Sequence, residues 1–209
     1  MKSTVFLTLI IVGMVSAEKT LLLDDFSGRD TINKLGWSWY YYSDDKDGGN
    51  SQIIGAERKP EGGYSGIIYD TVGNSSDYCG RLEFLLGEPD SVFFNDPFTG
   101  MGTDIAVSGS SVDLNGMTAV IFKARSDPPL HVCFELESAA IHNFAYHTSL
   151  ISTDTAWNEY TVAIDNLEQP DWIDRDEEFP INEVIDSIRK INWKIFHSDN
   201  KGLSDTGWL

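Results

Sequence analysis

Basic residues are scarce in this chain. Its 209 residues include 15 Lys and Arg against 33 Asp and Glu, which gives a formal net charge of −18. A surface of this sign repels nucleic-acid phosphates and anionic membranes, so the composition argues strongly against both as partners. A neutral ligand meets no such repulsion, and carboxylates are also the ligands that Ca²⁺ prefers.

Cysteine is rarer still, and the chain contains two, Cys79 and Cys133. Their spacing matches no zinc site. In an exported protein they could form a disulfide. The alternative is two buried free thiols, each in a strand.

Long apolar runs are absent apart from one at the N-terminus. Lys2 precedes an apolar stretch over residues 5–15, and Val15-Ser16-Ala17 is a small-residue cleavage signal. The run is too short to span a membrane, and no later stretch approaches the ~18 residues needed. Residues 1–17 are therefore predicted to be a secretory signal peptide. The alternative is an uncleaved N-terminal anchor or a lipoprotein signal. Cleavage leaves 209 − 17 = 192 residues, one domain over 18–209, with a charge of −18 − 1 = −19 because Lys2 is lost.

Helical patterns are few, and the rest of the chain consists of short β-rich segments separated by Gly, Pro, Asn, Asp and Ser clusters. This pattern predicts an all-β sandwich or barrel. A short helix is expected at 181–190, followed by a strand at 191–196. The other expected strands are 21–26, 36–43, 51–55, 64–72, 78–86, 102–107, 117–125, 130–137, 146–151 and 157–164.

Standard catalytic signatures are missing as well. The chain has no His-Glu-x-x-His, no Gly-x-Ser-x-Gly and no phosphate loop, and Gly100 and Gly102 form only a partial nucleotide-binding motif. The histidines show no metal-binding spacing. With 33 acidic residues, a pair of carboxylates suited to glycoside hydrolysis arises by chance, so counting them neither supports nor excludes that activity.

Aromatic residues, in contrast, are concentrated in one segment. Trp37, Trp39, Tyr40, Tyr41 and Tyr42 lie within six positions, directly before the acidic, Gly-rich stretch SDDKDGGN. In an extended strand the first, second and fourth of these share one face and the other two share the opposite face. We predict that the first group packs in the core and that Tyr40 and Tyr42 point away from it. Tyrosine rings suit sugar binding, because the flat apolar ring stacks on a pyranose while the hydroxyl stays hydrogen-bonded.

Several segments together resemble the family 11 carbohydrate-binding modules and the related complex I intermediate-associated proteins. The segments are LLLDDFSGRD, GWSWYYYSDDKDGGNSQI, WNEYTVAIDNLEQPDW and IRKINWKI, in this order. The resemblance implies a galactose-binding-like jelly roll of two antiparallel sheets, with a tyrosine-lined cleft on the concave sheet that binds a β-glucan. It implies no catalysis.

Candidate ligand-binding positions follow from that resemblance. Tyr42 and Tyr69 match cleft tyrosines, and Tyr40 shares the face of Tyr42. His131 or Glu135 lies on the strand where the family has an arginine, and Tyr146 or His147 lies near another cleft position. A shift of one residue would turn these side chains to the opposite face.

The resemblance also implies a structural Ca²⁺ with Asp24 and Asp25 on one side. Its other side belongs to a final acidic strand, which in the family follows a segment like Gly207-Trp208-Leu209. Within these 209 residues the sandwich is expected to lack its last strand, unless the chain is part of a longer protein. Calcium occupancy is therefore expected to be weak or absent.

Together these features predict a secreted, non-catalytic carbohydrate-binding module, either a monomer or a part of a longer chain, with a polysaccharide as its partner. The alternatives are a glycoside hydrolase or lyase, an accessory module of such an enzyme, and a domain for protein contact, adhesion or assembly.

Overall fold

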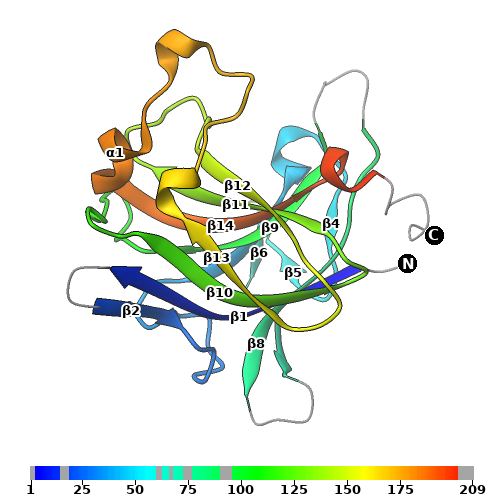
Figure 1. Cartoon of the computed structure of the whole chain (residues 1–209). Coiled ribbons are helices and arrows are strands. Elements are labelled where there is room, and N and C mark those ends of the chain that lie inside the picture. Colours follow the sequence, from blue (N-terminus) through cyan, green and yellow to red (C-terminus); the bar gives the residue numbers. More distant parts are fainter. Residues whose placement is uncertain are drawn as a thin grey trace.

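The computed structural model describes residues 3–14, 19–59, 63–65, 68–72, 77–89 and 96–201. These residues form two antiparallel sheets packed face to face (Figure 1). The predicted all-β sandwich is therefore confirmed. The end of the chain, including Gly207, Trp208 and Leu209, lies outside the described residues.

The first sheet has the strand order β13-β10-β1-β8-β4, with β2 pairing with β1 and β7 pairing with β8. Its strands are β1 (Ser3–Met14), β2 (Lys19–Asp24), β4 (Gln52–Ile53), β7 (Ile68–Thr71), β8 (Tyr78–Leu85), β10 (Ala119–Asp127) and β13 (Asn158–Ala163). The second sheet has the order β12-β11-β14-β9-β3. Its strands are β3 (Trp39–Ser43), β9 (Phe98–Asp104), β11 (His131–Ser138), β12 (His147–Ser152) and β14 (Ile188–Phe196).

The remaining elements are short. A small hairpin pairs β5 (Glu57–Arg58) with β6 (Tyr64–Ser65). The helix expected at 181–190 is limited to α1 (Ile181–Val184), followed by a 3₁₀ turn, η4 (Ile185–Ser187), and then by β14. The other 3₁₀ turns are η1 (Asp44–Asp47), η2 (Ile164–Asn166), η3 (Arg175–Glu177) and η5 (Ser198–Asn200). None of the helices in the described part of the chain is long and apolar enough to cross a membrane.

Residues 3–14, which the sequence assigns to a signal peptide, form β1 in the interior of the first sheet. Thr4 to Gly13 pair with β10 on one side, and Ser3 to Leu7 pair with β8 on the other. Val5 is buried in the core. Cleavage after Ala17 stays a prediction, and it would remove this strand from the sheet.

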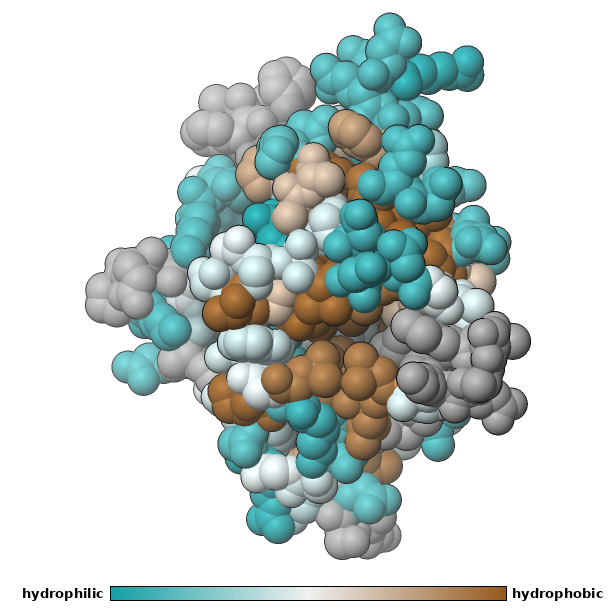
Figure 2. All heavy atoms as spheres, turned by 90° about the vertical axis from the view of Figure 1, so that its left-hand side faces the viewer, coloured by the Kyte–Doolittle hydropathy of each residue, from teal (hydrophilic) through white to brown (hydrophobic). Residues whose placement is uncertain are grey.

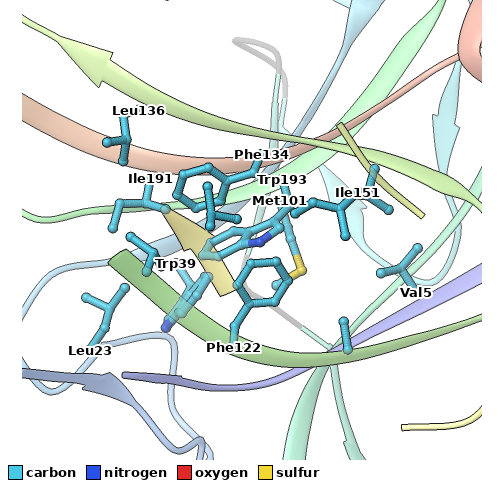
Figure 3. Packing of buried hydrophobic residues seen from close by; sticks show 14 of the residues in the cluster. Val5, Leu23, Trp39, Met101, Phe122, Phe134, Leu136, Ile151, Ile191 and Trp193 are labelled. Atoms are coloured by element: carbon cyan, nitrogen blue, oxygen red, sulfur yellow. The ribbon is translucent and has the colours of Figure 1, made fainter. Parts of the chain in front are cut away.

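The core lies between the two sheets and centres on Trp193 of β14 (Figure 3). Its ring centroid lies 5.5 Å from that of Phe122 on β10 and 5.7 Å from that of Phe134 on β11, both edge to face, and 6.0 Å from that of Trp39 on β3. Phe122 belongs to the first sheet and the other three to the second, so these rings join the two layers. From the side on which α1 lies, Figure 2 shows apolar atoms across the middle of the surface and hydrophilic atoms above and below.

The two cysteines do not form a disulfide, which was one of the two alternatives that the sequence left open. Cys79 lies on β8 of the first sheet and Cys133 on β11 of the second, and both are buried free thiols. Burial raises the pKa of the Cys133 thiol to about 12, which keeps it protonated and unreactive near neutral pH. The alternative of two buried thiols on separate strands is the one that the structure shows.

Candidate functional site

The aromatic strand β3 has its two faces arranged as predicted. Trp39 and Tyr41 point into the core, each 2% exposed. Tyr40 and Tyr42 lie on the outer face of the second sheet and are half-buried. Trp37, the third residue predicted for the core face, precedes the strand and is also half-buried. The pairing of β3 with β9 is regular, so no bulge changes this assignment.

Two glycines on the neighbouring strand allow both tyrosine rings to lie along the sheet. Tyr42 pairs with Gly100 and Tyr40 with Gly102. A Cβ at Gly100 would come within 2.5 Å of the Tyr42 Cζ and 2.7 Å of the Trp193 carbonyl oxygen, and one at Gly102 within 2.9 Å of the Tyr40 hydroxyl. The Tyr42 ring therefore occupies the space of the missing side chain at Gly100, and at Gly102 that space is taken by Asn192 Oδ1 and the Tyr40 hydroxyl. Glycines in a strand interior often mark this kind of close approach.

We expect Gly100→Ala to lower the free energy of unfolding by about 1–3 kcal/mol, the usual range for overpacking. The added methyl group would collide with the Tyr42 ring and with a backbone oxygen, and the backbone oxygen moves least. Urea unfolding measures the change. A double-mutant cycle with Tyr42→Ala tests the contact. The double variant should lose less unfolding free energy than the sum of the losses of the two single variants, because removal of the ring relieves part of the clash. Strict additivity would show that the ring does not lie on Gly100.

A chain of hydrogen bonds crosses the outer face from β3 to β11. The Tyr40 hydroxyl donates to Asn192 Oδ1 at 2.9 Å, and Asn192 Nδ2 donates to Glu135 Oε1 at 2.9 Å. Lys194 Nζ donates to Glu135 Oε2 at 2.8 Å. Asn192 and Glu135 are buried, so this network fixes the tyrosine and uses both oxygens of the carboxylate.

Four aromatic rings form a continuous row on this face, which we call the aromatic row. Successive ring centroids lie 6.0 Å apart for Tyr40 and Tyr42, 6.2 Å for Tyr42 and Phe98, and 5.9 Å for Phe98 and Phe196. Lys194 Nζ lies 5.4–5.9 Å from the centroids of the last three rings. Burial raises the pKa of both tyrosines well above the usual value, and the buried Tyr42 hydroxyl has no hydrogen-bond partner among the described residues.

A cleft of about 580 Å³ opens over one end of the aromatic row. Strands of the second sheet form its floor, and the segments before β12 and after η2 supply further aromatic side chains. Its lining residues are Asp47, Asp96, Phe98, Cys133, Glu135, Phe144, Thr148, Pro170, Trp172, Lys194, Phe196, Ser198 and Asp199. A cavity of this size with mainly apolar walls and a few polar groups is typical of a ligand-binding site.

The structure brings some of the predicted ligand-binding residues to this face. Tyr40, Tyr42 and Glu135 lie on it. His131 lies on β11 beside the cleft, where its Nδ1 is 3.0 Å from the Ser152 hydroxyl oxygen. It lines a neighbouring hollow rather than the cleft itself.

The other predicted residues lie elsewhere. Tyr69 belongs to β7 of the first sheet and packs against Phe26, with ring centroids 6.3 Å apart. Tyr146 is buried, and burial raises its pKa to about 12. Its ring lies 6.3 Å from that of Phe144, so it supports a cleft residue from below. The side chain of His147 is buried behind the sheet and lines a separate hollow with Phe179.

His147 gives the fold a pH dependence. Its ring is 3% exposed, its Nδ1 has no hydrogen-bond partner among the described residues, and burial lowers its pKa below 6.5. Between the lowered pKa and 6.5 the unfolded chain binds more protons than the folded one, so stability falls as the pH falls through this window. We expect the Tm to decrease from pH 7 to pH 5, and His147→Gln to reduce the decrease. The exposed His142→Gln is the matched control. Identical pH profiles for all three proteins would contradict this assignment.

The two aspartates expected at a calcium site are engaged with protein groups. Asp24 accepts from the Phe26 N–H at 2.9 Å and from Trp39 Nε1 at 2.6 Å, and burial raises its pKa despite these bonds. For Asp25, burial alone would raise the pKa. Hydrogen bonds from Ser27 and Lys34 outweigh this effect and lower the pKa to about 2. Among the described residues no group of three or more His, Cys, Asp or Glu is placed to hold a metal ion. Calcium binding at these two carboxylates therefore stays a prediction.

Several residues of the face were missed from the sequence. The alternation in INWKIF places Asn192, Lys194 and Phe196 opposite the core residues Ile191, Trp193 and Ile195, and this signal was available. Phe98 was missed because β9 begins at Phe98, four residues before the predicted strand. The loop residues Phe144 and Trp172 carried no periodic signal.

No family model matches the chain, but comparisons with known proteins show similarities in sequence and in structure. Endoglucanase 3 of Fibrobacter succinogenes (strain ATCC 19169 / S85) is 26% identical over 151 residues, which cover 72% of this chain. The aligned region spans only 21% of that enzyme. A solved family 11 carbohydrate-binding module from Clostridium thermocellum, in complex with a β-1,3-1,4-mixed-linked tetrasaccharide, aligns with 90% of this chain and 86% of its own, at 10% identity and a TM-score of 0.26.

Proposed function

We propose that this chain is a secreted, non-catalytic carbohydrate-binding module that holds a β-glucan chain along the aromatic row and in the adjoining cleft. The observation that carries the proposal is the row itself. The centroids of successive rings in the row lie 5.9–6.2 Å apart on the outer face of one sheet, and the cleft opens over the end formed by Phe98 and Phe196. A flat, extended apolar track flanked by hydrogen-bonding groups suits a chain of pyranose rings.

The floor of the site is preorganised, which favours binding. Tyr40 is held by Asn192, and both tyrosine rings are seated against glycines. Side chains fixed before binding lose little conformational entropy when the ligand arrives. Lys194, which is partly exposed at the edge of the row, adds a hydrogen-bond donor for sugar hydroxyls.

The choice of a β-glucan is supported by the sequence relative, which is an endoglucanase. This chain aligns with about a fifth of that enzyme, which fits an accessory module attached to a catalytic domain. We infer secretion from the predicted signal peptide, whose cleavage would also remove β1 from the first sheet.

The absence of catalysis is supported by the state of two carboxylates on the outer face, Glu135 and Glu137. Glu135 is bonded to Asn192 and Lys194, and Glu137 is paired with Arg189 and Lys190 at 3.1 Å each. Carboxylates held in this way are poorly placed to act as a proton donor and nucleophile on a glycosidic bond.

Affinity electrophoresis tests the binding proposal. The full chain is run through native gels containing mixed-linkage β-glucan, xyloglucan, xylan or no polymer. We expect retardation in at least one β-glucan gel. A neutral polymer is not repelled by the acidic surface of the protein, so charge does not oppose binding. Equal mobility in all gels would overturn the proposal and favour a role in protein contact.

The endoglucanase relative also makes glycoside hydrolysis a second candidate. Incubation of the purified chain with mixed-linkage β-glucan, followed by an assay for reducing ends, separates the two functions. Binding without release of reducing ends is the expected result, and release at a rate proportional to protein concentration would establish an enzyme.

A further inference from the structure

We propose that Phe144 and Trp172 form a second, loop-borne aromatic wall of the cleft, which grips the bound chain and, with the acidic rim, restricts the ligand to neutral glycans. This inference rests on the proposed function and concerns residues outside the strands. Phe144 is 76% exposed and Trp172 is 64% exposed, the two highest values among the exposed large hydrophobic residues described. Both line the cleft with Phe98 and Phe196 of the floor.

Phe144 is presented to solvent by a constrained backbone. Its φ angle of 64° lies in the left-handed region, which bulky residues rarely adopt. The Ala145 N–H donates to Asn143 Oδ1 at 3.2 Å, and the buried Tyr146 ring meets the Phe144 ring edge to face at 84°. An exposed aromatic ring held in an unfavourable conformation points to a function other than packing.

Trp172 is tied to the same structure by one side chain. Gln169 Nε2 donates to the Ala145 carbonyl oxygen at 2.5 Å, next to Phe144, and the Phe179 N–H donates to Gln169 Oε1 at 2.6 Å. Gln169 thus links the loop that carries Phe144 to the loop that carries Trp172 (in Figure 1, the loop that rises away from the sheet before α1). Ile173, directly after the tryptophan, is buried and anchors its base. The two exposed rings therefore belong to one connected wall.

The charge of the cleft identifies the ligand class. Its lining contains four carboxylates and a single basic side chain, Lys194, so its formal charge is 1 − 4 = −3. Lys194 is already paired with Glu135 at 2.8 Å. The pKa of Asp199 is raised mainly by burial and also by repulsion from the nearby carboxylate of Asp96. An anionic polysaccharide would face unpaired like charge here, whereas a neutral glycan would meet apolar rings and hydrogen-bond acceptors.

The wall is tested by affinity electrophoresis of the full chain in mixed-linkage β-glucan. We expect Trp172→Ala to weaken binding by about tenfold and Phe144→Ala by about threefold to tenfold, as for aromatic anchors. Phe179→Ala is the matched control, because Phe179 is 40% exposed on the same loop but lines the other hollow, and it should bind within about twofold of the unmodified chain. Because all three side chains are exposed, equal Tm values will confirm that folding is unchanged.

The ligand class is tested with two polymers that share one backbone, neutral hydroxyethylcellulose and anionic carboxymethylcellulose. Stronger retardation in the neutral polymer is expected. The wall proposal is overturned if Trp172→Ala and Phe144→Ala bind like the unmodified chain while Tyr40→Ala and Tyr42→Ala bind weakly, an outcome that leaves the proposed function standing. Equal or stronger retardation in the anionic polymer overturns the selection of neutral glycans. Failure of the unmodified chain to bind any polymer overturns both proposals.

Discussion

A chain that begins at Glu18 is expected to be far less stable than the full chain. It lacks β1, which pairs with β10 over most of its length and with β8 over its first half. Without it, the backbone groups on the facing edges of these two strands lose their partners. We expect a loss of about 5 kcal/mol or more, which corresponds to a decrease in Tm of roughly 10–20 °C for a domain of this size. Thermal unfolding followed by circular dichroism measures it.

A proline substitution provides a matched test without shortening the chain. Leu7 pairs with Ala124 on one side and Gly80 on the other. Leu7→Pro removes one donor from the interior of the sheet, which proline does not tolerate there. It should lower the Tm in the same direction as the deletion. If both proteins unfold like the full chain, residues 3–14 are not part of the folded domain and serve only as a leader.

Glu135→Ala is expected to have the second largest effect, a loss of about 3 kcal/mol in the free energy of unfolding. The substitution leaves the Lys194 ammonium group and the buried Asn192 amide without their shared acceptor. This value is at the lower end for a broken buried ion pair, because the Lys194 side chain is 17% exposed and can gain some hydration.

Two further variants interpret that result. Glu135→Gln keeps an acceptor for Asn192 and should cost less than the alanine. Glu159→Ala, at an exposed position of β13, should change the stability by no more than about 0.5 kcal/mol. Urea unfolding of the four proteins gives the comparison. Equal stabilities for Glu135→Ala and Glu159→Ala would mean that the network across the outer face does not hold in solution.

The face assignment of β3 could be predicted because strand alternation depends only on sequence position. It separated Trp39 and Tyr41 from Tyr40 and Tyr42 without knowledge of the partner strand. The position of β9 was harder. Gly100 and Gly102 have the composition of a turn, but they are strand residues whose missing side chains make room for the two tyrosines on β3.

Other features depend on contacts between distant segments. Tyr69 is aromatic and lies in a strand, but only the sheet topology shows that this strand belongs to the first sheet. The loops that carry Phe144 and Trp172 are joined by hydrogen bonds of Gln169, and the spacing of these residues in the sequence does not reveal this link. The apolar run at residues 3–14 fits a leader and a buried strand equally well, because short apolar runs carry no periodicity that separates the two.

The most direct test of the central claim is a heteronuclear NMR titration of the full chain with a mixed-linkage β-glucan oligosaccharide. It reports which backbone amides sense the ligand. The proposed site predicts the largest shifts in β9 and β14, around Gly100, Gly102 and Lys194, with further shifts near Phe144 and Trp172. Shifts confined to the first sheet, or no shifts at saturating ligand, would show that the aromatic row is not a sugar-binding site.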